Sequence, residues 1–214
     1  MAKVYSVKEI HKTLQGEGAQ AGRAAIFLRF SGCNLWSGLE KDRASAICQF
    51  CDTDFVGTNG ENGGKYTADA LAAKVADLWD EQSSSRANAY IVCTGGEPLL
   101  QLDENLIEAF KAHEFSVGVE TNGTLGAPRG LDWICVSPKA QTSIQLTSGN
   151  ECKLVFPQAG SDPAEYEALQ FEHYFLQPMD GPDIEANTRA AVQYCLAHPQ
   201  WRLSVQTHKW LGIA

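Results

Sequence analysis

Short runs of β-branched and aromatic residues alternate with amphipathic helical patterns along the chain, and this alternation constrains the fold more than any other feature. The apolar runs, interpreted as buried strands, cover residues 24–30, 89–93, 115–120, 132–137, 151–156, 173–178 and 202–207. The helical patterns cover residues 67–80, 102–113, 163–169 and 184–197. Strands separated by helices of this length predict right-handed βαβ units and a mainly parallel α/β sheet. The functional loops of such a sheet lie at the carboxyl ends of its strands.

Composition and charge exclude several classes of protein. The 17 basic and 26 acidic residues give a net charge of -9, which argues against a nucleic-acid-coating surface and favours small-molecule chemistry. No stretch approaches the roughly 20 apolar residues of a membrane span, and residues 1–10 lack the apolar core of a secretory signal. We therefore expect a cytoplasmic protein with one domain over residues 1–214, for which 44% hydrophobic residues are sufficient.

Three of the seven cysteines form a spaced cluster. Fourteen residues separate Cys33 from Cys48, and two separate Cys48 from Cys51. A C-x2-C pair with a third thiolate and no evident fourth ligand suits an iron-sulfur cubane with one open iron. From spacing alone, a structural zinc site and unligated thiols stay open as alternatives, although zinc normally takes four Cys or His ligands and the histidines are isolated. The odd cysteine count argues against a complete disulfide framework. The remaining cysteines lie in apolar segments and are expected in the core: Cys93, Cys135, Cys152 and Cys195.

Several motifs follow one another in a recognisable order. HKTLQGEG (11–18) precedes GRAAIFLRFSGCNLW (22–36), and TGGEP (94–98), ETNGT (120–124), SPK (137–139) and LQPMD (176–180) follow. Over nearly its whole length the sequence resembles the 7-carboxy-7-deazaguanine synthase family of the radical S-adenosylmethionine (SAM) superfamily. The resemblance implies an abbreviated partial (β/α) barrel of the radical SAM type. Because the usual superfamily spacing between the first two cluster cysteines is shorter, about residues 34–47 are interpreted as an insertion in the cluster-binding loop.

The resemblance assigns cofactor contacts. Cys33, Cys48 and Cys51 would hold a 4Fe-4S cluster that binds SAM at its open iron. Gly95 and Gly96 would bring the backbone close to SAM, since glycine permits the closest approach; a plain strand-to-helix turn is the alternative. The other expected cofactor contacts are Phe50, Asp52, Glu97, Glu120, Asn122, Ser137, Pro138, Lys139, Gln177, Pro178, Met179 and Asp180.

Substrate contacts are implied towards both ends of the chain. Arg29 would pair with a substrate carboxylate, because a guanidinium inside an apolar strand needs a partner; an internal salt bridge with Glu17 or Asp52 is the alternative. Thr53 would ligate Mg2+ beside water and substrate oxygens, although a helix cap or a turn also explains this residue. The other implied substrate contacts are Leu14, Gln15, Gly16, Glu17, Thr94, His208 and Ala214, with Lys209 a further candidate for the pocket.

The family resemblance implies a radical SAM lyase of queuosine and deazapurine biosynthesis. It would convert 6-carboxytetrahydropterin into 7-carboxy-7-deazaguanine with loss of ammonia, using a 4Fe-4S cluster, SAM and Mg2+. A homodimer and a flavodoxin-type electron donor are further expectations, whereas nucleic acid and membrane partners are not expected. The alternatives are a glycyl-radical activating enzyme that acts on a partner protein and a noncatalytic zinc-binding module.

Overall fold

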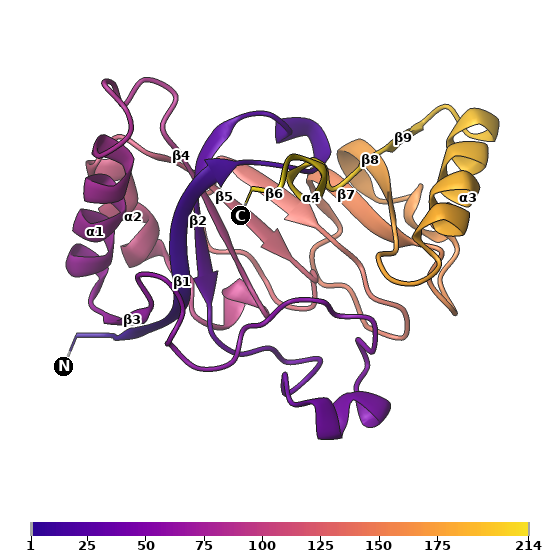
Figure 1. Ribbon diagram of the computed structural model, residues 1–214, viewed down its shortest axis with the longest axis horizontal. Helices are drawn as coiled ribbons and strands as arrows, with labels where there is room; N and C mark the ends of the chain where they lie inside the picture. The colour runs from indigo at the N-terminus through magenta and orange to yellow at the C-terminus, as the bar shows by residue number, and fades with distance from the viewer. Residues whose placement is uncertain (1, 214) are drawn as a thin grey trace.

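Strands and helices alternate along most of the chain, as the sequence pattern predicts. A computed structural model describes residues 2–213 (Figure 1). Its strands are β1 (Tyr5–Leu14), β2 (Ala24–Phe30), β3 (Gly64–Tyr66), β4 (Tyr90–Gly95), β5 (Ser116–Thr121), β6 (Trp133–Val136), β7 (Ser148–Phe156), β8 (Gln170–Pro178) and β9 (Trp201–Leu203). Its α-helices are α1 (Ala68–Asp80), α2 (Glu104–Ala112), α3 (Ile184–Ala197) and α4 (Thr207–Leu211). Short 3-10 helices occupy Gly18–Gln20, Glu40–Ser45, Pro98–Leu100 and Pro163–Tyr166.

The strands in residues 2–213 form one nine-stranded sheet in the order β3-β1-β2-β4-β5-β6-β7-β8-β9. Neighbouring strands from β2 to β9 are parallel, whereas β1 runs antiparallel to both β2 and β3. The sheet curves without closing on itself (Figure 1). The predicted α/β class, with a mainly parallel sheet in an incomplete barrel, is confirmed.

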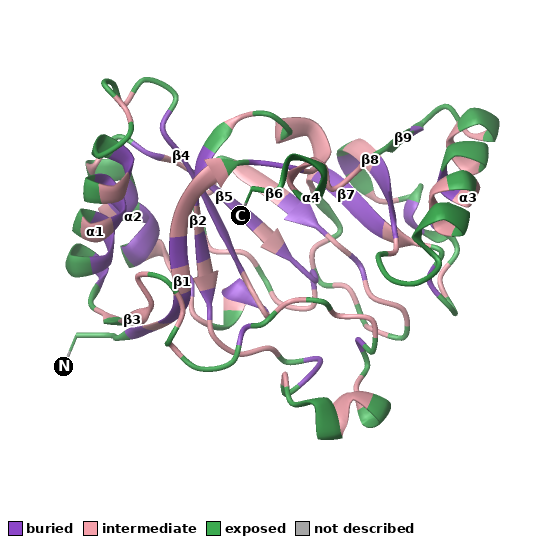
Figure 2. Cartoon of the chain, viewed as in Figure 1, coloured by how far each residue is buried: buried purple, intermediate pink, exposed green. Residues whose placement is uncertain are grey.

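Three helices lie at two ends of the sheet, and α4 lies near its middle (Figure 1). Helices α1 and α2 lie side by side and contact β1 and β5, respectively, and α3 lies beside β8 and β9. Thr67 caps α1 by accepting from the Ala70 N–H, and Asp103 caps α2 by accepting from the Leu106 N–H. Buried positions on α1 and α2 face the sheet, and exposed positions face outward (Figure 2). No helix in the described part of the chain is both long and apolar enough to cross a bilayer.

The apolar residues form separate clusters on the two faces of the sheet. One core lies between α1, α2 and the strands β1, β2, β4 and β5, and a second lies between α3 and β6–β9. Strand β4 serves both faces, because Ile91 and Cys93 belong to the first core while Tyr90 and Val92 face the other way. The cluster on that other face is small and comprises Ala25, Tyr90 and Val92, with Phe27 and Trp133 packed against it. Because this cluster is small, the concave side of the sheet has room for a cavity.

Three segments differ from the sequence prediction. Residues 163–169 form only a 3-10 turn from Pro163 to Tyr166, and the last predicted strand ends at Leu203 before helix α4 begins. Strand β1 has no counterpart among the predicted strands. A β-bulge between Val7 and Glu9 interrupts its two-residue period, so that Val7 and Lys8 are both buried.

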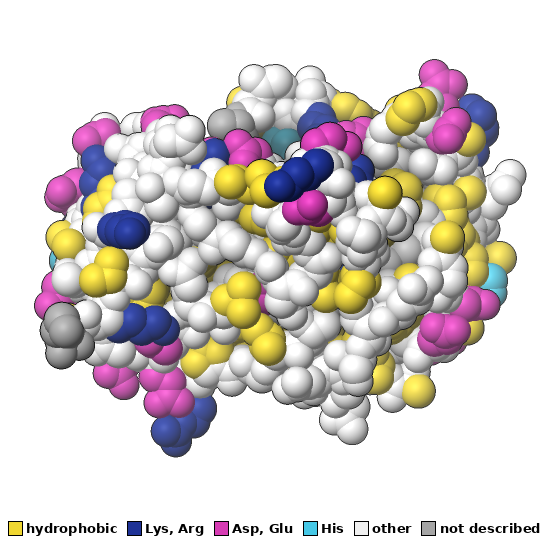
Figure 3. Space-filling model, turned by 90° about the horizontal axis from the view of Figure 1, so that it is seen from below, with side chains coloured by type: hydrophobic (Ala, Val, Ile, Leu, Met, Phe, Trp, Pro, Cys, Tyr) yellow, Lys and Arg dark blue, Asp and Glu magenta, His cyan; other side chains and the backbone are white. Residues whose placement is uncertain are grey.

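The surface mixes charges of both signs. On the face shown in Figure 3, acidic and basic side chains lie scattered among apolar ones and form no continuous basic patch. This distribution agrees with the net charge of -9 and gives this face none of the electrostatic features of a nucleic-acid-binding surface.

Candidate active site

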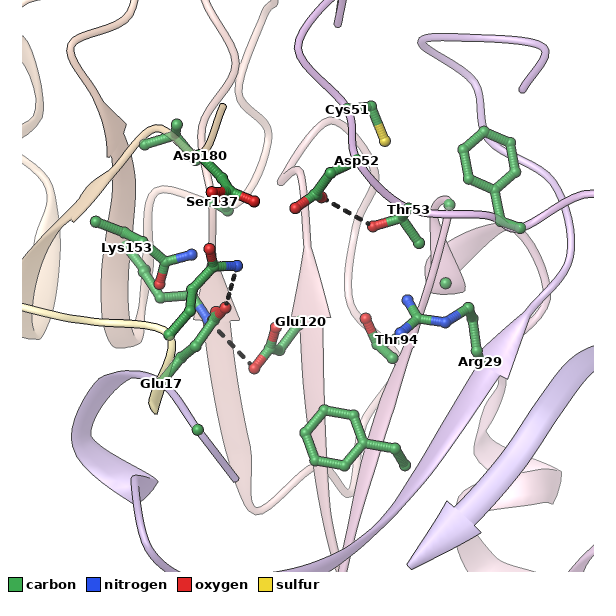
Figure 4. Close-up of a pocket in the computed structure, with 18 of the residues that line it drawn as sticks. Glu17, Arg29, Cys51, Asp52, Thr53, Thr94, Glu120, Ser137, Lys153 and Asp180 are labelled. Atoms are coloured by element: carbon green, nitrogen blue, oxygen red, sulfur yellow. Dashed lines mark hydrogen bonds and ion pairs between the residues drawn. The ribbon is translucent and has the colours of Figure 1, made fainter. Parts of the chain in front are cut away.

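A cavity of about 560 Å³ opens at the carboxyl ends of the parallel strands (Figure 4). The labelled side chains of Figure 4 come from strand ends and loops on all sides and point towards one common space. The predicted site residues that line the cavity are Leu14, Gln15, Gly16, Glu17, Arg29, Cys33, Cys48, Phe50, Cys51, Asp52, Thr53, Thr94, Gly95, Gly96, Glu120, Asn122, Ser137, Lys139, Gln177, Pro178, Met179, Asp180 and His208. Glu97 and Pro138 are not part of the lining, and Ala214 lies outside the described residues.

The three predicted cluster cysteines share one region of the cavity wall. Cys33 follows β2, and Cys48 and Cys51 flank a turn after the insertion. The Cys48 thiol donates to Cys51 and lowers the pKa of Cys51 to about 6, whereas burial raises the pKa of Cys33. Among residues 2–213, no three His, Cys, Asp or Glu side chains converge as a single metal ion requires. Three thiols in one region of the wall suit a cubane with one open iron, whereas a structural zinc site normally takes four Cys or His ligands.

The other cysteines play no part in this wall. All seven thiols are free, and Cys93, Cys135 and Cys152 are buried in the strands, as expected from the sequence. Cys195 on α3 is only half-buried. Burial raises the pKa of each of these four thiols, so they stay protonated near neutral pH and do not compete as ligands.

Residues 34–47, interpreted from the sequence as an insertion, support the cysteine turn from outside. Within residues 34–47, the 3-10 helix places Arg43 so that its guanidinium donates to the carbonyl oxygens of Gln49 and Cys51, at 2.8 and 3.0 Å. The same guanidinium lies 4.1 Å from the centroid of the Trp36 ring. The segment 40–45 is therefore attached directly to the backbone of the turn that carries Cys48 and Cys51.

The TGGEP turn at the end of β4 packs against the same loop. A Cβ atom at Gly96 would overlap the carbonyl oxygen of Gly32 and crowd Cys33, and one at Gly95 would overlap the carbonyl oxygen of Phe30. Gly95 also adopts a φ of 151°, which residues with side chains rarely adopt. Glycine is thus required here for the close approach of β4 to Gly32 and Cys33, as well as for an open cavity wall.

Glu97 is fully buried behind this turn. Its carboxylate accepts from the Thr121 hydroxyl at 2.7 Å, the Asn122 N–H at 2.8 Å and the Leu99 N–H at 2.9 Å. Burial raises the pKa of Glu97, and these donors oppose the rise. Glu97 therefore fastens the end of β4 to the end of β5, and the structure gives it no position facing a ligand.

The polar groups at the ends of β5 and β6 are already bonded within the wall. The Asn122 amide donates to the Asn34 side chain at 2.9 Å and accepts from the Thr124 N–H at 2.9 Å. The Lys139 ammonium donates to the carbonyl and hydroxyl oxygens of Ser137, at 2.6 and 2.7 Å, and burial lowers the pKa of Lys139. These bonds fix the side chains in place, so a ligand meets an ordered polar surface.

Arg29 extends from β2 into the cavity and is paired with Glu9. Its Nε donates to the Glu9 carboxylate at 2.8 Å. The expected alternative partners Glu17 and Asp52 are wrong, because β1 pairs with β2 and its register sets Glu9 opposite Arg29. The Nη atoms form no hydrogen bond with another described residue, which leaves one edge of the guanidinium for a bidentate carboxylate.

Lys153, which sequence reasoning missed, connects two predicted carboxylates (Figure 4). Its side chain on β7 is 4% exposed, and Nζ lies 2.6 Å from Glu17 and 3.3 Å from Glu120. Gln15 donates to Glu120 at 2.8 Å, and Gln206 donates to Glu17 at 3.0 Å. Burial favours the neutral forms, yet the ion pairing lowers the pKa of Glu17 and raises that of Lys153. The only signal in the sequence was a lysine inside the apolar run 151–156.

Helix α4 crosses the cavity and is attached on both sides. Thr207 donates through its N–H and hydroxyl to the Gly16 carbonyl oxygen, at 3.1 and 2.9 Å. The Lys209 ammonium lies 3.1 Å from Asp52, directly after the last cluster cysteine, and 2.5 Å from Asp180 after β8. The carboxyl-terminal part of the chain therefore links the cluster loop to the opposite wall.

Thr53 follows the cluster loop and points into the cavity (Figure 4). Its hydroxyl makes only a long contact of 3.5 Å with the Asp52 carboxylate. A single hydroxyl beside open space suits Mg2+, which keeps several water or substrate oxygens as ligands.

Strand β1 contributes further wall residues that the sequence did not indicate. His11 stacks on Phe27 with ring centroids 5.8 Å apart, and burial lowers the pKa of His11. The lining residues not predicted from the sequence are Glu9, His11, Thr13, Phe27, Leu35, Trp36, Asp54, Phe55, Glu61, Thr121, Lys153, Val155 and Gln206. Glu9, His11, Thr13 and Phe27 lie on the paired strands β1 and β2, so recognising β1 as a strand would have revealed this part of the wall.

Comparisons with known proteins agree with this geometry. No protein-family model matches the chain. A 7-carboxy-7-deazaguanine synthase of Caulobacter vibrioides is 64% identical over 210 residues, covering 98% of this chain and 99% of the relative. Synthases of the same name from Bordetella pertussis and Nitratidesulfovibrio vulgaris are 62% and 53% identical, with the same coverage.

A solved structure also resembles the fold. The crystal structure of QueE from Escherichia coli matches with a TM-score of 0.65 at 25% sequence identity, covering 95% of this chain and 94% of that one. The similarity thus extends over nearly the whole length of both chains. With more than half of its residues identical to several full-length relatives, the chain belongs to the 7-carboxy-7-deazaguanine synthase family.

Proposed function

We propose that this chain is a radical SAM lyase that converts 6-carboxytetrahydropterin into 7-carboxy-7-deazaguanine with loss of ammonia, in queuosine and deazapurine biosynthesis. The observation that carries the proposal is the 64% identity to a full-length synthase of that name. The cavity adds independent support, because one wall holds three cysteines and another presents an arginine with a free edge.

The donor groups of the cavity fit the cofactors of such an enzyme. When bound, a 4Fe-4S cluster supplies the electron that cleaves SAM into methionine and a 5'-deoxyadenosyl radical. Cys33, Cys48 and Cys51 would hold the cluster, and Thr53 would give Mg2+ one ligand. The residues proposed to line the SAM site are Phe50, Asp52, Gly95, Gly96, Glu120, Asn122, Ser137, Lys139, Gln177, Pro178, Met179 and Asp180.

The substrate would occupy the part of the cavity between Arg29 and the Glu17–Lys153–Glu120 network. The free edge of Arg29 binds the substrate carboxylate, and the carboxylates of Glu17 and Glu120 accept hydrogen bonds from ring N–H groups. Helix α4 covers this space and excludes water, which protects a reactive intermediate from side reactions. The chain thus orients the substrate, while the cofactor supplies the radical.

Location and assembly are further parts of the proposal. Seven free thiols suit a reducing compartment such as the cytoplasm. A homodimer would cover exposed apolar side chains such as Leu196 and Trp210, each 79% exposed. We also propose that residues 1–214 act as one radical SAM domain with an insertion at about 34–47, reduced by a flavodoxin-type donor.

The test is an anaerobic assay of cluster-reconstituted protein with SAM, reductant, Mg2+ and 6-carboxytetrahydropterin. Mass spectrometry follows 7-carboxy-7-deazaguanine, and a Cys51→Ala variant serves as the control. Product from the unmodified protein alone supports both the cluster chemistry and the substrate. Cleavage of SAM to 5'-deoxyadenosine without that product would reject the substrate, and the search would then turn to a partner protein as in glycyl-radical activating enzymes.

A further inference from the structure

Lys153 is a buried cation placed between two carboxylates of the cavity wall. Its ammonium contacts Glu17 on the turn after β1 and Glu120 at the end of β5, while its own side chain comes from β7. Three segments that are remote in sequence therefore meet at one buried charge. No step of the proposed reaction uses this lysine.

The other charged groups around Lys153 are bonded elsewhere. Glu151 accepts from the Ala19 N–H at 2.9 Å, and the Lys139 ammonium is held by Ser137. The Cys135 thiol is fully buried and protonated. Glu17 and Glu120 thus share a single ammonium, with Glu151 a third carboxylate nearby, and neither Glu17 nor Glu120 has another cation within ion-pair distance in residues 2–213.

Each carboxylate also carries a second contact that extends the network. Glu120 accepts from Gln15, a predicted substrate contact, and Glu17 accepts from Gln206, which precedes helix α4. A shift of the Lys153 ammonium would therefore move Gln15, a predicted substrate contact, and Gln206, next to helix α4, at the same time.

We propose that Lys153 is a positioning residue for the substrate, because it holds Glu17 and Glu120 at a fixed separation and so sets where the substrate lies against the reacting radical. The inference rests on the proposed function, since it requires the substrate to lie in this cavity. Lys153 touches no reacting atom and acts through the two carboxylates. Accurate placement matters because a displacement of about 1 Å can cost about 100-fold in rate.

The experiment compares Lys153→Met, Lys153→Arg, Glu17→Gln and the double variant K153M/E17Q in the reconstituted enzyme. Lys153→Met leaves two carboxylates that repel each other, so we expect kcat/KM for 6-carboxytetrahydropterin to fall about 100-fold and the ratio of 5'-deoxyadenosine to product to rise. The double variant lacks the negative charge of Glu17, so its kcat/KM should be about 10-fold higher than that of Lys153→Met. Lys153→Arg should retain most of the coupling between SAM cleavage and product.

Recovery of kcat/KM and of the ratio of 5'-deoxyadenosine to product at an unchanged melting temperature distinguishes positioning from a merely structural role, since a structural role would change the melting temperature as well. Lys12→Met is the matched control, because Lys12 bonds to the Trp79 carbonyl oxygen and Ser83 and is not part of the lining of this cavity. Iron content and melting temperature are recorded for every variant. If Lys153→Met does not fold, the double variant and Lys153→Arg carry the test.

Two results would overturn the inference while leaving the proposed function intact. One is a Lys153→Met enzyme whose ratio of 5'-deoxyadenosine to product equals that of the unmodified enzyme. The other is a double variant whose losses are the product of the two single losses, which would show that the charges of Glu17 and Lys153 are not coupled. Absence of product from the unmodified enzyme would reject the proposed function itself.

Discussion

Replacing Arg43 by methionine tests whether the insertion supports the cluster loop. Methionine keeps much of the length and apolar surface but removes the hydrogen bonds to the carbonyl oxygens of Gln49 and Cys51, the pair with Glu40 and the contact with Trp36. We expect the loop to open more often in the absence of any cofactor.

The magnitude follows from these contacts. A hydrogen bond from a charged donor contributes about 1.5 kcal/mol at the low end of its range, which applies here because the Arg43 side chain is 30% exposed. Two such bonds give about 3 kcal/mol, equivalent to about a 100-fold larger opening constant. The Ile47 amide, which donates to the Leu35 carbonyl oxygen at 3.2 Å, reports this opening.

Hydrogen exchange of the cofactor-free protein measures the effect. Exchange at Ile47 should accelerate by about 100-fold while the melting temperature changes little, because the opening is local. Arg129→Met is the control, since Arg129 also pairs with a carboxylate but is 91% exposed and bonds no loop carbonyl. Unchanged exchange at Ile47 in Arg43→Met would refute the idea that the insertion holds the loop.

Three further substitutions test other parts of the site. Glu97→Gln leaves a buried donor without an acceptor at a cost of about 2 kcal/mol, so the melting temperature should fall by about 4–8 °C. Burial raises the pKa of Glu97, so the unmodified protein loses stability as pH rises from the ordinary glutamate pKa through the raised pKa. The glutamine variant lacks this ionisation and does not lose stability in the same way. The difference in melting temperature between the two proteins should therefore become smaller as pH rises. Lys209→Met removes the exposed ion pairs with Asp52 and Asp180 and should lower the melting temperature by less than about 4 °C. Because these pairs attach α4 to the cavity wall, proteolysis near α4 should become faster. Thr53→Ala should raise the Mg2+ concentration for half-maximal activity about 10-fold, whereas Thr53→Ser should not.

The regular parts of the fold could be predicted because their signals are local. The apolar run 24–30 coincides with β2, and the amphipathic pattern 184–197 coincides with α3. Strand β1 could not be recognised in this way, because its bulge buries Lys8 next to Val7 and breaks the alternation. A periodic pattern predicts an element only while the backbone keeps its regular period.

The site shows the same division between local and long-range information. The cysteine cluster and the glycine turn of TGGEP are contiguous motifs, and both lie in the cavity wall. Lys153 and Glu17 are 136 positions apart, and Lys209 and Asp52 are 157 apart. The roles of such charges depend on which strands become neighbours, and a single sequence carries no direct signal for that pairing.

The attachment of helix α4 to the turn after β1 has a consequence for the order in which the protein matures. Thr207 bonds to Gly16 across 191 positions, so this part of the wall can close only after nearly all of the described chain has been synthesised. Bringing such remote segments together is also the slowest kind of contact to form. During synthesis, therefore, the three thiols proposed to hold the cluster emerge early, whereas helix α4 is made last and completes the cavity wall only then. The nascent chain is most vulnerable to oxidation at these thiols before the wall is complete.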